Sequence, residues 1–212
     1  MSLLEFIKKS PKAELHLHIE GTLEPNQMFA LAKKNNIQIP FKSIEDVKEA
    51  YNFNNLESFL KIYYEGTKVL LKENDFFELT WAYALKCKED NIIHTEIFFD
   101  PQTHTNRGIS FDIIINGIYK ALKKAEKEFG LSFKIIMCFL RHLSEEECFK
   151  ILDQALVHKD KIFGVGLDSS EMGNPPKKFE KLFKKAAENN FITVAHAGEE
   201  GPPEYIWEAL NL

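Results

Sequence analysis

Two histidines two residues apart, His16 and His18, are the residues of this sequence best suited to chemistry. The segment 15–19 alternates apolar and polar residues, so both imidazoles face the same side of a predicted strand. Two imidazoles placed in this way can bind one divalent metal ion. Far downstream, a second apolar run ends at His196 and is followed three residues later by Glu199. Three histidines and an acid at the ends of two strands predict a metallohydrolase site that keeps one coordination position open for water.

The elements that must position these residues follow an alternating pattern. Five short apolar runs are predicted as strands, and they cover Glu14–Ile19, Ile92–Phe99, Phe133–Leu140, Ile162–Leu167 and Ile192–His196. Segments with helical spacing of apolar residues lie between them, at Leu56–Leu71, Phe76–Cys87, Phe111–Phe129, Glu145–Val157 and Pro176–Asn189. Ser144 with Glu147 forms a predicted capping box, and Gly130 is placed as a C-cap glycine. Strands that alternate with helices predict a parallel sheet covered by helices.

Polar residues gather where the predicted strands end, which is typical of the active-site face of a TIM (β/α)8 barrel. A doubly wound sheet would carry a glycine-rich phosphate turn after its first strand, but this sequence has histidines there. Only five of eight barrel strands are visible in the 212 residues. We therefore expect residues 1–212 to be the N-terminal part of a single barrel domain, interrupted inside its fifth strand–helix unit, with the sixth to eighth strands absent from this chain.

The composition of the chain excludes several classes of binding partner and of cellular location. The net charge of −5 and the pI near 5.8 argue against nucleic acid as an obligate partner. No apolar run is long enough for a membrane span, and the N-terminus lacks the pattern of a signal peptide. The three cysteines form no Cys-x-x-Cys pair, which favours buried thiols in a reducing cytoplasm.

Two sequence motifs, each containing histidine, resemble motifs of a known protein family. Pro11-Lys-Ala-Glu-Leu-His-Leu-His-Ile-Glu-Gly-Thr-Leu-Glu-Pro25 and Thr193-Val-Ala-His-Ala-Gly-Glu-Glu-Gly-Pro-Pro203 resemble the histidine motifs of the adenosine/adenine deaminase family of zinc amidohydrolases. Residues 98–104, 139–144 and 166–176 resemble its adenine deaminase branch. The resemblance implies zinc as cofactor and His16, His18 and His196 as its ligands. It also implies that Glu199 is the catalytic acid, which protonates the purine ring nitrogen beside the amino-bearing carbon.

Candidate substrate-binding residues lie at Glu20 and directly after the fourth predicted strand. The resemblance implies that Glu20 occupies the motif position at which relatives that act on nucleosides carry an aspartate that reaches the ribose. The side chain of glutamate is one methylene longer and could occupy the space of the ribose, which would favour a free base as the substrate. Alternatively, its carboxylate hydrogen-bonds the following turn. Four residues after the fourth predicted strand either shape the base pocket or form a helix-capping cluster before Pro175 and Pro176: Asp168, Ser169, Ser170 and Glu171. Tyr63 and Tyr64, in the long first crossover, are candidates to cover the pocket.

A second class of zinc deaminase is excluded, because His18-Ile19-Glu20 matches its His-x-Glu motif but no Cys-x-x-Cys follows. The resemblance implies a cytoplasmic enzyme of purine salvage that hydrolyses adenine, a small-molecule purine substrate, to hypoxanthine and ammonia. The alternative substrate is adenosine or another adenine nucleoside. In a third reading the chain is a catalytically silent, truncated barrel that self-associates or needs its C-terminal part. The family uses a further histidine and an aspartate pair whose counterparts are expected beyond residue 212.

Overall fold

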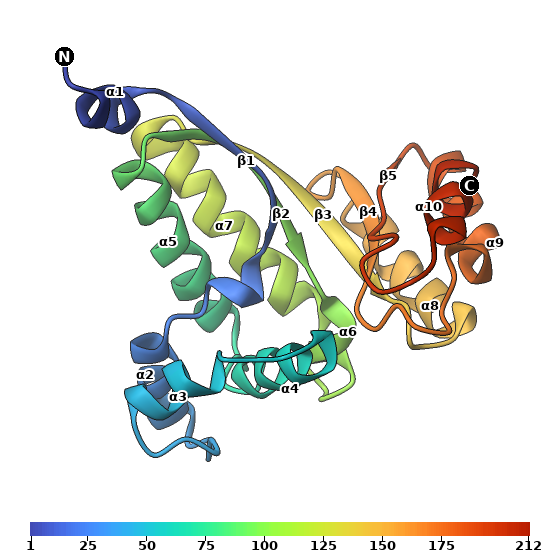
Figure 1. The fold of residues 1–212 in the computed structure, drawn as a ribbon, viewed down its shortest axis with the longest axis horizontal. Coiled ribbons are helices and arrows are strands. Elements are labelled where there is room, and N and C mark those ends of the chain that lie inside the picture. Colours follow the sequence, from blue (N-terminus) through green and yellow to red (C-terminus); the bar gives the residue numbers. More distant parts are fainter.

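The computed structural model describes residues 1–212 and contains one sheet of five parallel strands in the order β1-β2-β3-β4-β5 (Figure 1). The strands are β1 (Lys12–His18), β2 (Ile92–Phe99), β3 (Ser132–Leu140), β4 (Gly164–Asp168) and β5 (Ile192–Thr193). Each strand pairs in parallel with the next one along the chain, so all five carboxyl ends lie at the same edge of the sheet. This confirms the predicted parallel sheet.

Ten α-helices and two short 3-10 helices connect and cover the strands. The α-helices are α1 (Leu3–Lys9), α2 (Pro25–Asn35), α3 (Ile44–Ala50), α4 (Leu56–Thr67), α5 (Glu73–Glu89), α6 (Pro101–Thr105), α7 (Phe111–Phe129), α8 (Glu145–Val157), α9 (Glu180–Glu188) and α10 (Pro203–Leu210). The 3-10 helices are η1 (Ile19–Thr22) and η2 (Pro176–Phe179). None of these helices combines the length and the apolar character that crossing a membrane requires.

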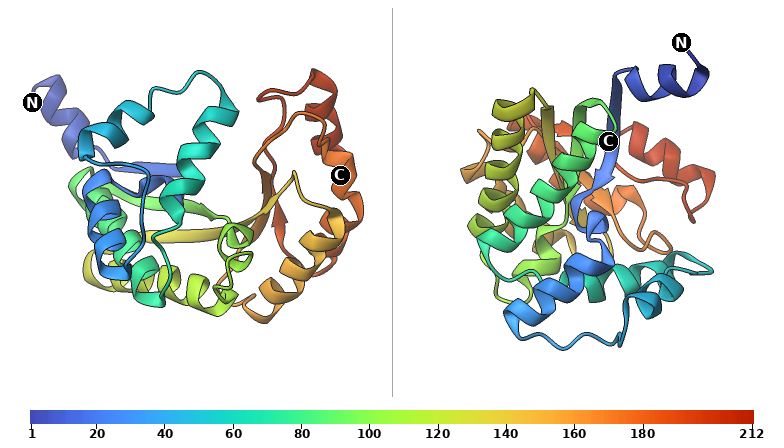
Figure 2. Two further views of the ribbon diagram at one scale, coloured as in Figure 1. Left: turned by 90° about the horizontal axis from the view of Figure 1, so that it is seen from below. Right: turned by 90° about the vertical axis from the view of Figure 1, so that its left-hand side faces the viewer.

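The main core lies between the sheet and the helices on its outer side. Figure 2 shows the strands twisting and curving from β1 to β5, with α7, α8 and α9 following the convex side. Alternate residues of the central strands, such as Ile97, Ile135 and Met137, enter a single cluster of 37 buried apolar residues on this side. Helices α5 and α7 cross closely at Gly117, where an added Cβ would lie 2.4 Å from the carbonyl oxygen of Glu73.

The opposite, concave face carries a much smaller apolar cluster. Phe98, Ile136 and Cys138 pack there with Val194. The register of β1 against β2 is irregular between Glu14 and Leu17, so strict alternation does not hold along the whole of β1. His16 lies within this irregularity and His18 follows it, yet both rings stack on Phe98, so the two histidines share the concave face, as predicted.

Several element boundaries were predicted correctly. Helices α7 and α8 have the expected bounds, Ser144 and Glu147 form the capping box, and Gly130 ends α7 in the left-handed conformation. Strand β5, however, ends at Thr193 and does not reach His196 as predicted. The backbone N–H groups of Val194 and His196 still donate to β4 carbonyls, so this segment follows the sheet edge without regular strand geometry. Helices α1, α2, α3 and α6 were not predicted. Helices of this length are marginal by themselves, and α2, α3 and α6 each bury residues against the rest of the protein, whereas α1 buries none.

Candidate metal and active site

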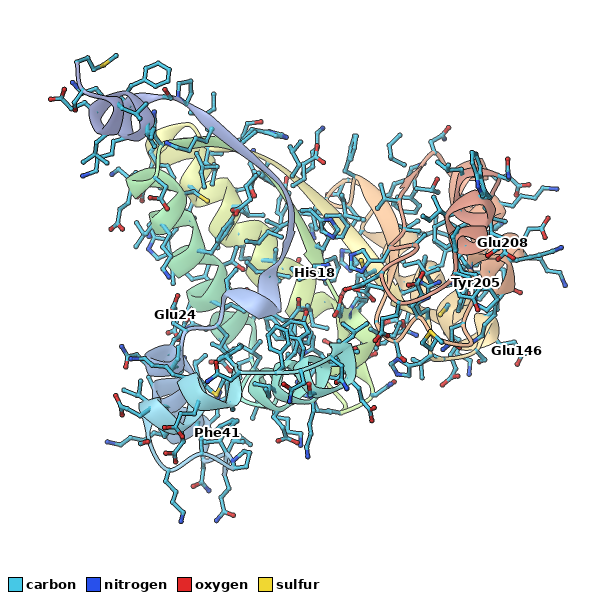
Figure 3. The ribbon with its side chains drawn as sticks, viewed as in Figure 1. His18, Glu24, Phe41, Glu146, Tyr205 and Glu208 are labelled. Carbon is cyan, nitrogen blue, oxygen red and sulfur yellow. The ribbon has the colours of Figure 1, made fainter.

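Three histidines from opposite edges of the sheet converge at its carboxyl end. His16 and His18 come from β1, and His196 comes from the segment after β5. The Nε2 atom of His196 lies 2.7 Å from Nε2 of His16 and 3.4 Å from Nε2 of His18. Figure 3 labels His18, which lies near the centre of the molecule where β1 gives way to η1. The predicted histidine cluster is therefore assembled by the fold.

The chemistry of this donor set fits a metal ion. Tetrahedral coordination at 2.0–2.1 Å places two ligand nitrogens about 3.3 Å apart. The His18–His196 separation of 3.4 Å matches this spacing, and the His16–His196 separation of 2.7 Å is shorter. Burial, followed by the neighbouring His18 and His16, lowers the pKa of His196 to about 4. Burial and then His18 also lower the pKa of His16. Both rings are therefore neutral at neutral pH, which is the form that binds metals.

The outer nitrogen of His18 faces carboxylates. Its Nδ1 lies 3.4 Å from Oδ2 of Asp168 and 3.7 Å from Oδ1 of Asp100. Burial by itself would lower the pKa of His18, but the hydrogen bond and charge of Asp100 raise it overall. A carboxylate on the outer nitrogen of a metal-binding histidine fixes its tautomer and orientation. The ring of Phe98 stacks on both β1 histidines, with centroid distances of 4.6 Å to His16 and 5.1 Å to His18.

A cavity of about 120 Å³ opens beside these histidines. Helix α4 supplies one wall, and the strand ends and the segment after β5 supply the others. The lining residues are His18, Leu56, Phe59, Leu60, Tyr63, Tyr64, Asp100, Asp168, Ser169, His196 and Glu199. Five apolar or aromatic residues together with six polar ones suit a flat heteroaromatic ligand that also forms hydrogen bonds.

Glu199 reaches this cavity from a loop. Its Oε2 lies 3.7 Å from Nδ1 of His196, and its side chain is 47% exposed. Burial, followed by the charges of Glu171 and Glu200, raises the pKa of the Glu199 carboxyl. A carboxyl group that holds its proton to higher pH beside a ligand cavity is equipped for general acid catalysis.

A family model described as adenosine deaminase matches residues 11–212. The chain belongs to the adenosine deaminase family. Among curated relatives, the adenine deaminase of Acinetobacter baylyi is 61% identical over 212 residues, which are 100% of this chain and 64% of that protein. The adenine deaminase of Psychrobacter cryohalolentis is 63% identical over 210 residues, which are 99% of this chain and 63% of that protein. The chain thus spans less than two thirds of either relative.

Solved structures of the family show the same architecture. The adenine deaminase of Arthrobacter aurescens superposes with a TM-score of 0.92 and 49% identity, covering 95% of this chain and 62% of that one. An amidohydrolase from Burkholderia ambifaria with bound Zn superposes with a TM-score of 0.88 and 25% identity, covering 100% of this chain and 59% of that one. The predicted TIM-barrel class is thereby confirmed, and five of the barrel strands lie in this chain.

Within this family architecture, Glu20 is held by protein groups. It is only 4% exposed, and its Oε1 accepts hydrogen bonds from the Asp100 N–H at 3.0 Å and from His104 Nε2 at 3.1 Å. Arg107 donates to Nδ1 of His104 at 2.9 Å, which leaves the ring hydrogen on the nitrogen that faces Glu20. The hydroxyl of Tyr63 lies 3.2 Å from the other oxygen of Glu20. Glu20 does not line the cavity, and a direct contact between Glu20 and a substrate stays a prediction.

Asp168, the last residue of β4, and the three residues after it have separate positions. Asp168 and Ser169 line the cavity, whereas Ser170 and Glu171 do not. Ser169 has a φ of 74°, and its hydroxyl lies 2.8 Å from the Tyr64 hydroxyl and 2.9 Å from Nδ1 of His142. The alternative of a helix-capping cluster is wrong, because η2 starts after Pro175 without a side-chain cap.

Sequence reasoning missed several residues of this site. Asp100 and Arg141 were visible only as polar residues at predicted strand ends, and spacing gave no sign of their partners. The α4 residues Leu56, Phe59 and Leu60 had the pattern of an ordinary amphipathic helix. Their place in the cavity wall depends on how the first crossover folds back over the sheet, and that is not a local property of the sequence.

Proposed function

We propose that this protein contributes the metal site and the proton donor for zinc-dependent hydrolytic deamination of adenine to hypoxanthine and ammonia. The observation that carries the proposal is the convergence of three histidine Nε2 atoms beside a cavity that also contains Glu199. Curated relatives at 61% and 63% identity are named adenine deaminase, which supports adenine as the substrate. The Zn bound in the Burkholderia ambifaria amidohydrolase supports zinc as the metal.

In this proposal His16, His18 and His196 hold the metal through their Nε2 atoms. Zinc, when bound, supplies a water nucleophile at neutral pH. Asp168 and Asp100 keep the His18 ring in the orientation that presents Nε2 to the cluster. Phe98 fixes the planes of the two β1 rings by stacking on them.

Glu199 gives a proton to the purine ring nitrogen adjacent to the amino-bearing carbon. Protonation of this nitrogen withdraws electrons from the neighbouring carbon and favours attack on it. Water then forms the new carbon–oxygen bond and loses both of its protons. One proton goes to the amino group, which leaves as ammonia when the carbon–nitrogen bond breaks, and the other returns to the Glu199 carboxylate. The α4 side chains Leu56, Phe59 and Leu60 exclude bulk water from one side of the base.

The preference for a free base rests on the restricted cavity and on the names of the relatives. Tyr63 and Tyr64 close the cavity on the α4 side, and their hydroxyls are tied to Asp100 and Ser169 at 3.0 and 2.8 Å. A ribose on the purine would require space that these fixed aromatic rings limit. The proposed place of the enzyme is purine salvage.

An ultraviolet assay of the zinc-loaded protein on adenine and on adenosine tests the proposal. We expect conversion of adenine and much slower conversion of adenosine. Equal or faster turnover of adenosine would favour the adenine-nucleoside alternative. Absence of turnover with both compounds, at full zinc occupancy, would favour the catalytically silent alternative.

A further inference from the structure

The segment that carries Glu199 is anchored at both ends by two buried charged residues. This segment, residues 196–201, is called the Glu199 loop below. Glu171, which follows β4, and Arg141, which follows β3, are both 0% exposed. Neither residue lines the cavity beside the histidines.

Glu171 holds the Glu199 loop through its backbone N–H groups. Its Oε1 accepts a hydrogen bond from the N–H of Gly198 at 2.7 Å. Its Oε2 accepts from the N–H of Glu200 at 2.7 Å and from that of Gly201 at 2.8 Å. Both oxygens of the Glu171 carboxylate therefore accept hydrogen bonds from backbone N–H groups on either side of Glu199. Hydrogen bonds of this charged kind are roughly twice as strong as neutral ones.

Arg141 holds the beginning of the same loop. Its Nη1 donates to the backbone carbonyl of His196 at 2.7 Å and lies 3.7 Å from Oε1 of Glu171. Its Nε and Nη2 donate to the carbonyl of Asn174 at 2.9 and 2.7 Å. Arg141 therefore joins His196, the first residue of the Glu199 loop, to Asn174, which lies three residues after Glu171. Its positive charge also balances the buried negative charge of Glu171.

The side chain of Glu199, in contrast, has little to hold it. Its one neighbour within ion-pair distance is Nδ1 of the neutral His196 ring, at 3.7 Å. The position of its carboxyl group is consequently set by the backbone from which it projects, and that backbone is fixed by Glu171 and Arg141.

We propose that Glu171, supported by Arg141, is a positioning residue that fixes the Glu199 loop so that the Glu199 carboxyl faces the substrate. Glu171 acts on the reaction through the backbone of this loop and does not touch the substrate. The inference rests on the proposed function, because it assigns Glu171 to the proton transfer that Glu199 performs.

The substitution Glu171→Gln tests this directly. An amide has one acceptor oxygen, and its NH2 group would face N–H donors of the loop, so one of the two anchor points is lost. Glu145→Gln is the matched control, because Glu145 also accepts a backbone N–H, that of Leu182 at 3.0 Å, but does so between α8 and α9. Zinc content, kcat and KM for adenine, and amide hydrogen exchange at residues 198, 200 and 201 are measured for both variants.

We expect Glu171→Gln to bind zinc as the unsubstituted protein does and to lose kcat by roughly 10–100-fold with little change in KM, since small misplacement of a catalytic group is costly. Exchange of the three loop amides should accelerate. Glu145→Gln should keep both its turnover and its loop protection. The shorter carboxylate of Glu171→Asp cannot span both anchor points and should show an intermediate kcat, so it serves if Glu171→Gln does not fold.

Two results would overturn the inference. An unchanged kcat per bound zinc, with only thermal stability reduced, would make Glu171 a purely structural residue. A raised KM at unchanged kcat would instead place Glu171 in contact with the substrate, which is one of the two alternatives that the sequence left open. If the unsubstituted protein does not deaminate adenine, the proposed function fails, whereas accelerated exchange of the loop amides in Glu171→Gln would still establish the anchor.

Discussion

The Nδ1 atom of His18 lies 3.4 Å from Oδ2 of Asp168, which links the first strand of the sheet to the fourth. The two residues are 150 positions apart in the chain, yet the carboxyl ends of parallel strands bring them to one edge. The opposite nitrogen of the same ring, Nε2, lies 3.4 Å from Nε2 of His196, so we infer that Asp168 orients His18 toward the histidine cluster. Orientation of a metal-binding histidine by a carboxylate usually contributes strongly to metal affinity.

Substitution Asp168→Asn is therefore expected to weaken zinc binding by about 10–100-fold. Chelator competition measures the zinc affinity of the variant and of the control Asp153→Asn, which lies at an exposed position of α8. The control should bind zinc normally. Equal affinity of Asp168→Asn and the control would show that Asp168 does not orient His18.

Substitution Glu199→Gln should leave zinc binding intact and reduce turnover of adenine by about 10²–10⁴-fold, because an amide cannot donate the required proton. Zinc content and steady-state kinetics are measured together, with Glu204→Gln on exposed α10 as the control. Loss of zinc with normal activity per remaining zinc would identify Glu199 as a metal ligand instead.

Substitution Gly117→Ala should destabilise the crossing of α5 and α7. Its Cβ would lie 2.4 Å from the Glu73 carbonyl oxygen and 2.7 Å from Cβ of Phe76, so the helices must separate. Overpacking of this kind costs about 1–3 kcal/mol, which outweighs the better helix propensity of alanine. Urea unfolding compares it with Lys127→Ala on the exposed side of α7. A gain in stability for Gly117→Ala would refute the close approach.

Substitution Asp75→Asn should make stability less dependent on pH in the acid range. Burial would raise the pKa of Asp75, but hydrogen bonds from Lys34, the Leu71 and Lys72 N–H groups and Asn35 lower it overall from 3.8. A carboxylate with a lowered pKa in the folded state stabilises the fold above its unfolded pKa, and this contribution is lost as the pH falls through the folded pKa.

The free energy of unfolding of Asp75→Asn should accordingly be about 1–3 kcal/mol lower than that of the unsubstituted protein at pH 7. The difference should shrink at a pH well below 3.8, where the carboxylate becomes protonated. Urea unfolding of both proteins, at pH 7 and at the acid pH, measures this difference in the free energy of unfolding. A difference of the same size at both would exclude the charge of Asp75 as its source.

Local sequence patterns determined much of the fold. The alternation of apolar runs with helical patterns predicted the parallel sheet and its helical cover, because strand and helix periodicities depend only on neighbouring residues. The bounds of α7 and α8 and the capping box at Ser144 were also predictable, since a cap involves residues three apart. The spacing of His16 and His18, with His196 at a later strand end, was sufficient to predict which histidines would meet.

Only the tertiary structure decided how the polar residues around these histidines are used. Glu20, Asp168 and Glu171 all carry a carboxyl group, but their surroundings differ. Glu20 is enclosed by Tyr63, Asp100 and His104. Asp168 lies beside His18, and Glu171 accepts hydrogen bonds from the backbone around Glu199. The partner of a buried carboxylate lies on another strand or crossover, tens of residues away. Its identity depends on how the strand ends and the long crossover containing α4 come together, and no periodicity or local spacing records that arrangement.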